Sequence, residues 1–239
     1  MPTSTVTEVV FFRVRPEIKP EAPETNQDSY NLLWLLRDTK QQHGHMGSAW
    51  GRTVEDEDVI VWVLAWADAR GTSRSVLLQP YLAPTTEVLT LFTTLTPAVD
   101  IGTLCGNPVT ELCPLTFPTS LTPDKHNEVN EALIKLRSEM LENIQVSDGE
   151  EAKKVRPRNW SMGHVDRPGT RSHPTSPSGE AFVVFLFIGW ESVDAHLRAR
   201  ETEQFLENMK PLREMMLPTG AGLLPGSGWG MSHAIFREP

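Results

Sequence analysis

Two stretches of the chain are apolar at almost every position. They are residues 59–66, Val-Ile-Val-Trp-Val-Leu-Ala-Trp, and residues 181–190, Ala-Phe-Val-Val-Phe-Leu-Phe-Ile-Gly-Trp. Their β-branched and aromatic content predicts strands. A strand with one face in water alternates apolar and polar residues, and these two do not alternate. We therefore expect both strands to be buried on both faces.

Each of these strands has the same kinds of element around it. In the first half we predict a strand at 6–14, a helix at 26–43, a hairpin of 46–53 with 59–66, a weak helix at 73–81 and a strand at 88–95. In the second half we predict a strand at 109–117, a helix from Thr122, a hairpin of 158–165 with 181–190, a helix capped by Ser192 and a strand at 229–236. Pro211 predicts a kink or restart in that last helix. The order is β-α-β-β-α-β, twice.

This order is that of the ferredoxin-like, or split βαβ, unit. A four-stranded sheet with helices on one face leaves its other face bare, and two such sheets can cover each other. We predict an α+β protein with two tandem ferredoxin-like units, residues 1–104 and 105–239, whose antiparallel sheets pack as a barrel within one chain. The two halves should then unfold together.

Composition limits the partners. The 239 residues carry 31 acidic and 22 basic side chains, a formal net charge of −9, which disfavours nucleic acid. No basic leader with an apolar core opens the chain, and no apolar run reaches the roughly 20 residues that span a bilayer. Cys105 and Cys113 lack CxxC spacing and are expected to be reduced. We expect a cytoplasmic protein without a membrane partner, and a homodimer stays open.

The segment from Gly189-Trp190-Glu191-Ser192 through His196 to Phe205 carries a family resemblance. It resembles the strand-to-helix segment of the dimeric α+β barrel superfamily, in particular antibiotic-biosynthesis-monooxygenase-like (ABM-like) proteins of the fungal tandem-domain type. The resemblance covers residues 109–239, and residues 6–96 loosely. The first half keeps Trp66 at the matching place but has no matching histidine. The resemblance implies a pocket between sheet and helices, bordered by Trp190 and His196.

Period two along the strands places further candidates beside this pocket. We predict His164 and His196 as catalytic residues, because imidazole, with a pKa of about 6.5, exchanges protons at neutral pH. Ring faces would hold a flat substrate and a guanidinium would hold a carboxylate or enolate. The predicted substrate-binding residues are Arg158, Trp160, Trp190, Trp229 and His233. The alternative is that the tryptophans fill the core and the histidines are hydrogen-bonded or exposed.

The sequence predicts neither a metal nor another cofactor. His43-Gly44-His45 is the one close pair of histidines, and a metal needs more ligands. A haem could use His164, His196 or His233 as its axial ligand, but no CxxCH attachment motif is present. No GxSxG motif is present. No glycine-rich segment precedes a helix, as a phosphate-binding loop would.

The resemblance implies a cofactor-independent enzyme of secondary metabolism that acts on an aromatic or polyketide-like small molecule by oxygenation, cyclisation or rearrangement. The superfamily also includes haem-degrading enzymes and proteins with no assigned catalysis, and a fold does not determine function. The competing hypothesis is therefore a non-catalytic ligand-binding or interaction protein of the stress-responsive α/β barrel type.

Overall fold

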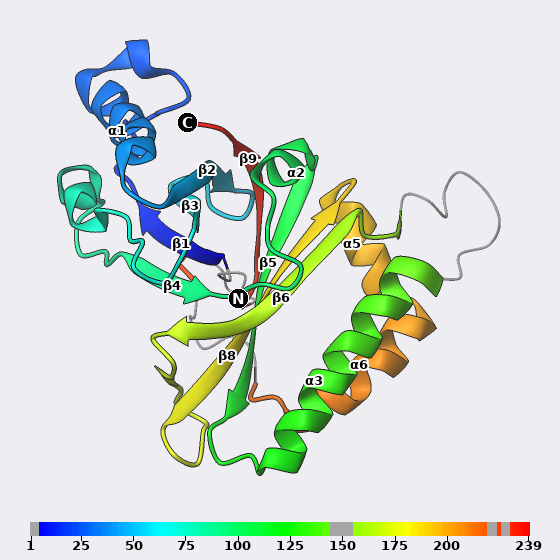
Figure 1. Ribbon diagram of the computed structural model, residues 1–239. Coiled ribbons are helices and arrows are strands. Elements are labelled where there is room, and N and C mark those ends of the chain that lie inside the picture. Colours follow the sequence, from blue (N-terminus) through cyan, green and yellow to red (C-terminus); the bar gives the residue numbers. More distant parts are fainter. Residues whose placement is uncertain (1–4, 144–154, 219–223, 226–229) are drawn as a thin grey trace.

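An antiparallel β-barrel flanked by helices forms the centre of the computed structural model, which describes residues 5–143, 155–218, 224–225 and 230–239 (Figure 1). The strands are β1 Val6–Arg13, β2 His45–Thr53, β3 Val59–Trp66, β4 Leu89–Thr93, β5 Val109–Pro118, β6 Asn159–Arg167, β7 Arg171–Ser172, β8 Glu180–Trp190 and β9 Ser232–Arg237. The α-helices are α1 Gln27–Asp38, α2 Ile101–Gly106, α3 Pro123–Ser138, α5 Val193–Arg200 and α6 Glu203–Met215. Shorter helical turns are η1 Pro23–Thr25, η2 Thr39–Gln41, η3 Ser75–Tyr81 and η4 Glu139–Asn143.

Within the described residues, eight of the strands close the barrel. Their order is β5-β9-β2-β3-β1-β4-β6-β8, and β8 pairs back with β5. Every neighbouring pair is antiparallel. The predicted α+β class with an antiparallel barrel is therefore confirmed.

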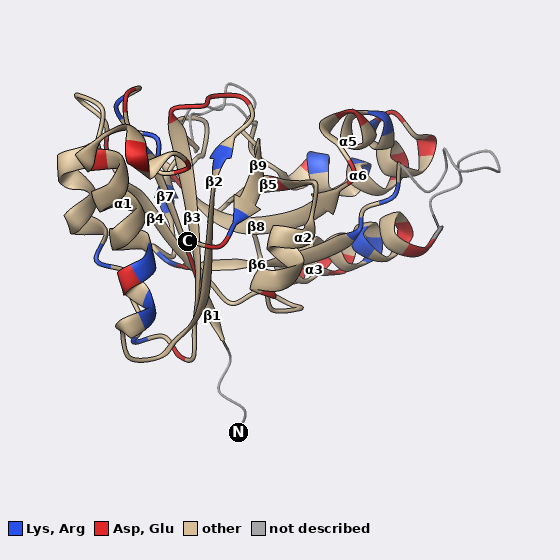
Figure 2. Cartoon of the chain, turned by 90° about the horizontal axis from the view of Figure 1, so that it is seen from above, with Lys and Arg blue, Asp and Glu red and all other residues tan. Residues whose placement is uncertain are grey.

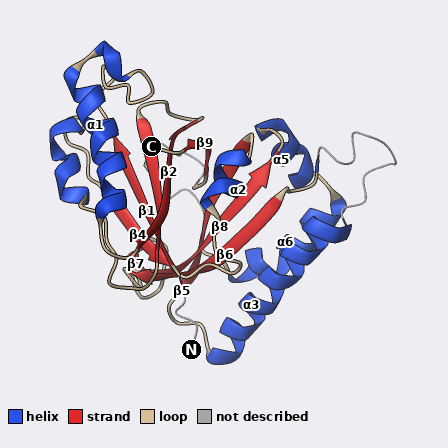
Figure 3. Cartoon of the chain, turned by 45° about the horizontal axis from the view of Figure 1, so that its top comes forward, coloured by secondary structure: helices blue, strands red, loops and turns tan. Residues whose placement is uncertain are grey.

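The barrel divides into two four-stranded arcs with the same internal order. The first arc runs β2-β3-β1-β4 and the second runs β6-β8-β5-β9. They meet at two seams, β2 with β9 and β4 with β6. Figure 3 shows α1 on the outside of the first arc and α3 with α6 on the outside of the second, at opposite sides of the barrel.

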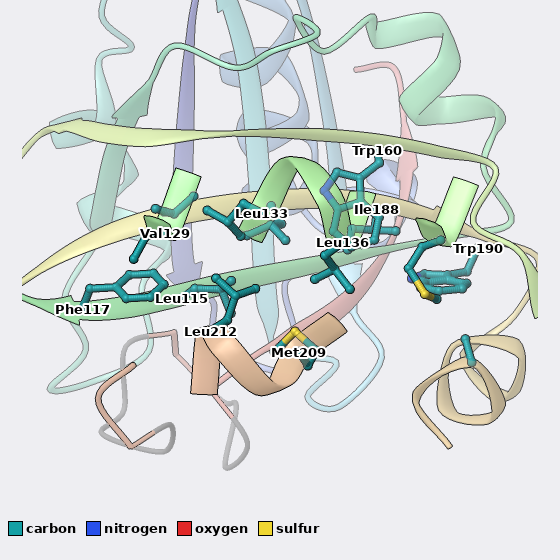
Figure 4. Close-up of a cluster of buried hydrophobic side chains, with 14 of the residues drawn as sticks. Leu115, Phe117, Val129, Leu133, Leu136, Trp160, Ile188, Trp190, Met209 and Leu212 are labelled. Atoms are coloured by element: carbon teal, nitrogen blue, oxygen red, sulfur yellow. The ribbon is translucent and has the colours of Figure 1, made fainter. Parts of the chain in front are cut away.

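The central strands are buried on both faces, as their sequence predicts. In β8, Val183, Phe185 and Phe187 point into the barrel, whereas the alternate residues face α3 and α6. Strand β3 divides in the same way. The ring of Phe11 lies 6.3 Å from that of Phe185 across the barrel, so the two arcs share one inner core. Figure 4 shows the outer cluster between the second arc and its helices, with Phe117 at one end and Trp190 at the other.

The connection from β8 to the helices follows from two caps. Ser192 accepts a hydrogen bond from the backbone N–H of Ala195 at 3.0 Å and starts α5, and Thr202 accepts one from Phe205 N–H at 3.2 Å and starts α6. The prediction of a restart at Pro211 is wrong, because Pro211 lies inside α6 and the restart is at Thr202 instead.

Other differences from the predictions are local. The cap of α1 is Asn26, which accepts from Ser29 N–H at 2.8 Å. Residues 75–81 form a 3-10 helix in place of the weak α-helix, with Pro80 inside it. The connection between the arcs contains the short helix α2, in which the predicted boundary at 104/105 falls. Among the described residues, no helix is both long and apolar enough to cross a membrane.

Charged residues lie mainly outside the barrel. In Figure 2 most of the strands are tan, and the red and blue segments gather on helices and connecting loops. The buried carboxylates Glu8 and Glu111 are exceptions to this distribution.

Candidate active site

A cavity of about 390 Å³ lies between the second arc and helices α5 and α6. Its walls come from β5, β6 and β8 on one side and from α5, α6 and one residue of α3 on the other, and residues 216–218 and 230–231 complete them. Most of the lining is apolar, with titratable or charged groups at Glu111, His196, Arg200 and Arg213. The full lining is Glu111, Cys113, Pro114, Leu115, Leu136, Trp160, Leu186, Ile188, Trp190, His196, Arg200, Phe205, Met209, Arg213, Met216, Leu217, Pro218, Gly230 and Met231.

A carboxylate is buried in this apolar wall. Glu111 on β5 is 4% exposed, and its Oε2 accepts a hydrogen bond from Trp190 Nε1–H at 2.9 Å. The same oxygen lies 3.4 Å from Nε2 of His196. The imidazole of His196 stacks on the Trp190 ring at a centroid distance of 5.0 Å. The end of β8 and the start of α5 thus place an acid, an indole and an imidazole in contact.

Behind His196, a second imidazole and a second carboxylate extend this cluster. His196 Nδ1 lies 2.8 Å from His233 Nε2, and His233 Nδ1 lies 2.5 Å from Glu55 Oε1. His196 is 2% exposed, and burial lowers its pKa below the ordinary histidine value. At neutral pH the ring is therefore mostly uncharged. It can accept a proton in the cavity.

The structure brings four of the predicted site residues together. Trp160, Trp190 and His196 line the cavity, and His233 joins it through His196. Trp229 lies outside the described residues.

The expectation that His164 shares a cavity with His196 is wrong. His164 is exposed, does not line the cavity, and pairs through Nε2 with Asn130 at 3.1 Å. Period two places it on the same face of β6 as Trp160, but four residues further along. At about 3.3 Å per residue it lies roughly 13 Å away along the strand.

Arg158 also lies away from the cavity. It precedes β6, does not line the cavity, and forms an exposed ion pair with Glu191 at 2.7 Å. The guanidinium groups at the cavity are those of Arg200 and Arg213 instead. Among the described residues, neither arginine has a side-chain carboxylate partner.

The sequence analysis missed Glu111 and Glu55, although Glu111 carries a signal. Val-Thr-Glu occurs at residues 6–8 and again at 109–111, at the start of the first strand of each half. In each half the tryptophan at the end of the third strand pairs with the valine of this tripeptide and donates its indole N–H to the glutamate. The repeat therefore marks a Glu–Trp pair in both arcs.

Comparisons with known proteins agree on the fold. No family model and no curated protein matches the sequence. A solved structure titled as a study of an anthrone oxidase-like protein aligns with a TM-score of 0.55 at 14% identity, over 98% of this chain and 93% of that chain. A candidate chlorite dismutase aligns with a TM-score of 0.55 at 10% identity, over 99% and 96%. A candidate monooxygenase from Fusobacterium nucleatum aligns with a TM-score of 0.50 at 9% identity, over 100% and 94%.

These neighbours are ABM-like and related dimeric α+β barrel proteins. The chain has the fold of the dimeric α+β barrels. Identities this low establish the fold alone, so the chemistry has to be argued from the residues.

The first arc of this dimeric α+β barrel has the Glu–Trp pair without the histidine. Glu8 accepts from Trp66 Nε1–H at 2.9 Å and from Ser73 N–H at 2.6 Å, and the Ser73 hydroxyl lies 2.7 Å away. Gly71 packs directly against the Trp66 ring. The segment 71–73 thus occupies the place that His196 has in the second arc.

Haem is a cofactor for which the sequence offers candidate axial ligands, namely His164, His196 and His233. An axial ligand needs a nitrogen lone pair directed at the iron. Nδ1 of His196 is bonded to His233, and Nε2 faces Glu111. His164 lies outside the cavity and bonds Asn130. His164 and His233 therefore offer no axial ligand in this cavity, because both nitrogens of His233 are also bonded, and the histidine nitrogen that remains, Nε2 of His196, lies 3.4 Å from the carboxylate of Glu111. The described residues contain no group of three His, Cys, Asp or Glu side chains placed to hold a metal ion.

Proposed function

We propose that the protein is an enzyme that removes a proton from an aromatic or polyketide-like small molecule, without a bound cofactor, and that His196 is the base. One observation carries this proposal: a buried imidazole, with its pKa lowered by burial, borders an apolar cavity of about 390 Å³. A general base has to be unprotonated at the operating pH, and it works best when its pKa lies near that pH.

The walls of the cavity suit a flat ligand that becomes an anion. Trp160 and Trp190 offer ring surfaces for stacking. The Nε1–H of Trp160 is buried and has no partner among the described residues, so a carbonyl or phenolate oxygen of the ligand would satisfy it. Arg200 and Arg213 would stabilise the enolate that forms when the proton leaves.

The enolate can react further in more than one way. With dioxygen as the co-reactant, one anthrone and one dioxygen would give one anthraquinone and one water. The two hydrogens of the methylene carbon leave with one oxygen atom, and the other oxygen becomes the new carbonyl. Without dioxygen, the same enolate would cyclise or rearrange. The neighbours described as a monooxygenase and as anthrone oxidase-like favour oxygenation.

We further propose that the chain is a fusion of two ferredoxin-like units, residues 1–104 and 105–239, of the fungal tandem type used in secondary metabolism. The repeated strand order and the repeated Glu–Trp pair support the fusion. The second unit would hold the working site. The first would supply the partner sheet that other barrels obtain from a second copy.

An anthrone can test the reaction directly. We expect the wild-type protein to accelerate dioxygen uptake and anthraquinone formation, followed by an oxygen electrode and by absorbance. His196→Asn should lower kcat/KM by about 10²–10⁴, as loss of a general base does. The matched control is His164→Asn, which changes a histidine outside the cavity and should leave kcat/KM nearly unchanged.

Three other results would contradict the whole proposal or one of its steps. Equal loss in the His164 and His196 variants would remove His196 as the base. Deuterium exchange of the substrate without dioxygen uptake would point to cyclisation or rearrangement. Binding that quenches tryptophan fluorescence, with neither exchange nor turnover, would establish the non-catalytic ligand-binding alternative.

A further inference from the structure

Glu55, His233 and His196 form a continuous series of contacts from the surface to the cavity. The Glu55 side chain is 26% exposed, that of His233 is 4% exposed and that of His196 is 3% exposed. The distances along the series are 2.5 Å and 2.8 Å, and His196 then reaches Glu111 at 3.4 Å. Each nitrogen of both imidazoles thus has a neighbour in the series.

Hydrogen bonds hold Glu55 against His233 at the outer end of the series. Glu55 lies in the turn between β2 and β3 and belongs to the first arc, whereas His233 lies on β9 in the second. Both carboxylate oxygens of Glu55 are used: Oε1 by the imidazole, and Oε2 by the backbone N–H of His233 at 2.9 Å. The backbone N–H of Val54 also donates to the carbonyl of His233 at 2.7 Å. The carboxylate is therefore fixed against one nitrogen of one ring.

We propose that Glu55 and His233 form a proton relay that carries the proton taken up by His196 from the cavity to solvent, with Glu55 as the positioning residue supplied by the first arc. The inner end of the relay rests on the proposed function, because that function supplies the proton. The outer end rests on hydrogen bonds alone.

Hydrogen bonding fixes the direction of the relay. An ionised carboxylate only accepts, so His233 carries its hydrogen on Nδ1 and leaves Nε2 bare when it is neutral. Nε2 of His233 then accepts from Nδ1–H of His196, which leaves Nε2 of His196 bare on the cavity side. When that nitrogen takes a proton from substrate, its ring can pass the Nδ1 proton to His233. The resulting imidazolium lies against Glu55, and the proton leaves from there to water.

The charges around the series favour transfer in this direction. Burial raises the pKa of Glu55, but hydrogen bonds from His233 outweigh it and hold that pKa below the ordinary value, so Glu55 is ionised at neutral pH. The groups facing His196 are Glu111 on β5, Trp190 on β8, His233 on β9 and the cationic Arg200 at the end of α5. Burial disfavours a positive charge on His196 and outweighs Glu111, which favours that charge from 3.4 Å, and Arg200 also disfavours it, whereas His233 has a carboxylate at 2.5 Å.

Nitrogen NMR of the ligand-free full-length chain tests the relay without any substrate. With ¹⁵N-labelled histidine, we expect wild-type His233 to show a protonated, hydrogen-bonded Nδ1 at neutral pH. Glu55→Gln keeps an oxygen acceptor but removes the charge. It should move the midpoint of the His196 titration to lower pH, because the charge of Glu55 favours the protonated form of that ring. Glu57→Gln removes a charge from the same turn, away from His233, and should leave the midpoint unchanged.

Turnover separates the relay from the proposed function. If anthrone is oxidised, Glu55→Gln should lower kcat and shift its pH profile, with KM unchanged, and Glu55→Asp should restore part of the loss. A midpoint that is the same in wild type, Glu55→Gln and Glu57→Gln, or a His233 with an unprotonated Nδ1 at neutral pH, would overturn the relay. A shifted midpoint in a protein that neither exchanges substrate deuterium nor oxidises anthrone would leave the outer pair of Glu55 and His233 standing and remove the proposed function.

Discussion

At the scale of single residues, the two arcs differ in the partners of one buried glutamate, Glu8 in the first arc and Glu111 in the second. Each buries a glutamate that receives an indole N–H from the tryptophan at the end of the third strand, at 2.9 Å in both cases. A buried carboxylate needs donors for its remaining lone pairs. In the first arc Ser73 supplies them from the same arc. In the second arc the neighbour is His196, which also faces the cavity.

This difference predicts unequal effects of two matched substitutions. Trp190→Phe leaves Glu111 without its indole donor and should lower the free energy of unfolding by about 1–3 kcal/mol beyond the cost of the smaller ring. Trp66→Phe makes the same change in ring size, but Ser73 still donates to Glu8, so its additional cost should be smaller. Urea unfolding followed by circular dichroism measures both. An equal or larger loss for Trp66→Phe would contradict this account of Glu111.

The sequence predicts the local part of the site and not the part that the fold assembles. Trp190, Ser192 and His196 are neighbours in the chain, so their spacing places them at a strand end and on the first turns of a helix. Glu55 is 178 residues from His233, and no local pattern relates them. His164 was placed on the correct face of β6 at the wrong position along it, because a period of two gives the face but not the end of the cavity.

At the scale of elements, the connection after the third strand distinguishes the arcs. After β8 two capped helices, α5 and α6, cover the sheet and enclose the cavity. After β3 the chain passes through residues 71–73 over Glu8 and then forms only the 3-10 helix η3. Pro80 lies inside this segment, for which the sequence predicts only a weak helix.

Residues 71–73 cover Glu8, and the burial of this carboxyl group predicts that the stability of the protein depends on pH. Burial is the main cause that raises the pKa of Glu8 above its ordinary value of 4.5, so the folded protein holds this proton more tightly than the unfolded chain. At pH values between the pKa of Glu8 in the unfolded chain and its higher pKa in the folded protein, the unfolded state binds fewer protons. The free energy of unfolding therefore falls as pH rises through this range. Each unit of difference corresponds to about 1.4 kcal/mol.

Glu8→Gln should abolish that fall. Its oxygen can accept from Trp66 and Ser73 N–H, and its amide can donate to the Ser73 hydroxyl, so the hydrogen bonds of Glu8 are kept without the charge. We expect a variant more stable than wild type at about pH 8 and similar to it below the ordinary glutamate pKa. Urea unfolding across this range is the measurement, with Glu57→Gln as the exposed control. A Glu8→Gln profile parallel to that of wild type would show that Glu8 is not the titrating group.

At the scale of the whole molecule, the barrel depends on two seams between the arcs. The apolar pattern of β3 and β8 predicts that both faces of these strands are buried, and together with the repeated β-α-β-β-α-β order it predicts that two sheets cover each other. The pattern did not specify how the edges pair. The structure shows that β2 pairs with β9 and β4 with β6, so each arc contributes its second and fourth strands to the closure.

A glycine lies at each seam, in corresponding places. A Cβ on Gly51 of β2 would collide with the backbone carbonyl of Ile235 in β9, and a Cβ on Gly163 of β6 would collide with the carbonyl of Thr94 beyond β4. Backbone atoms cannot move aside as the end of a side chain can. Glycine at both positions therefore allows the edge strands to approach closely enough to pair.

Substitution at either seam should weaken the whole barrel. We expect Gly51→Ala and Gly163→Ala each to lower the free energy of unfolding by about 1–3 kcal/mol through overpacking. Gly106→Ala, at the end of α2, meets no atom within 4 Å and is the matched control. Because the inner core is shared, hydrogen exchange should accelerate in β1 and β3 as much as in β5 and β8, whichever glycine is changed. Faster exchange confined to the arc that carries the substitution would show instead that the arcs unfold independently and that the seams do not couple them.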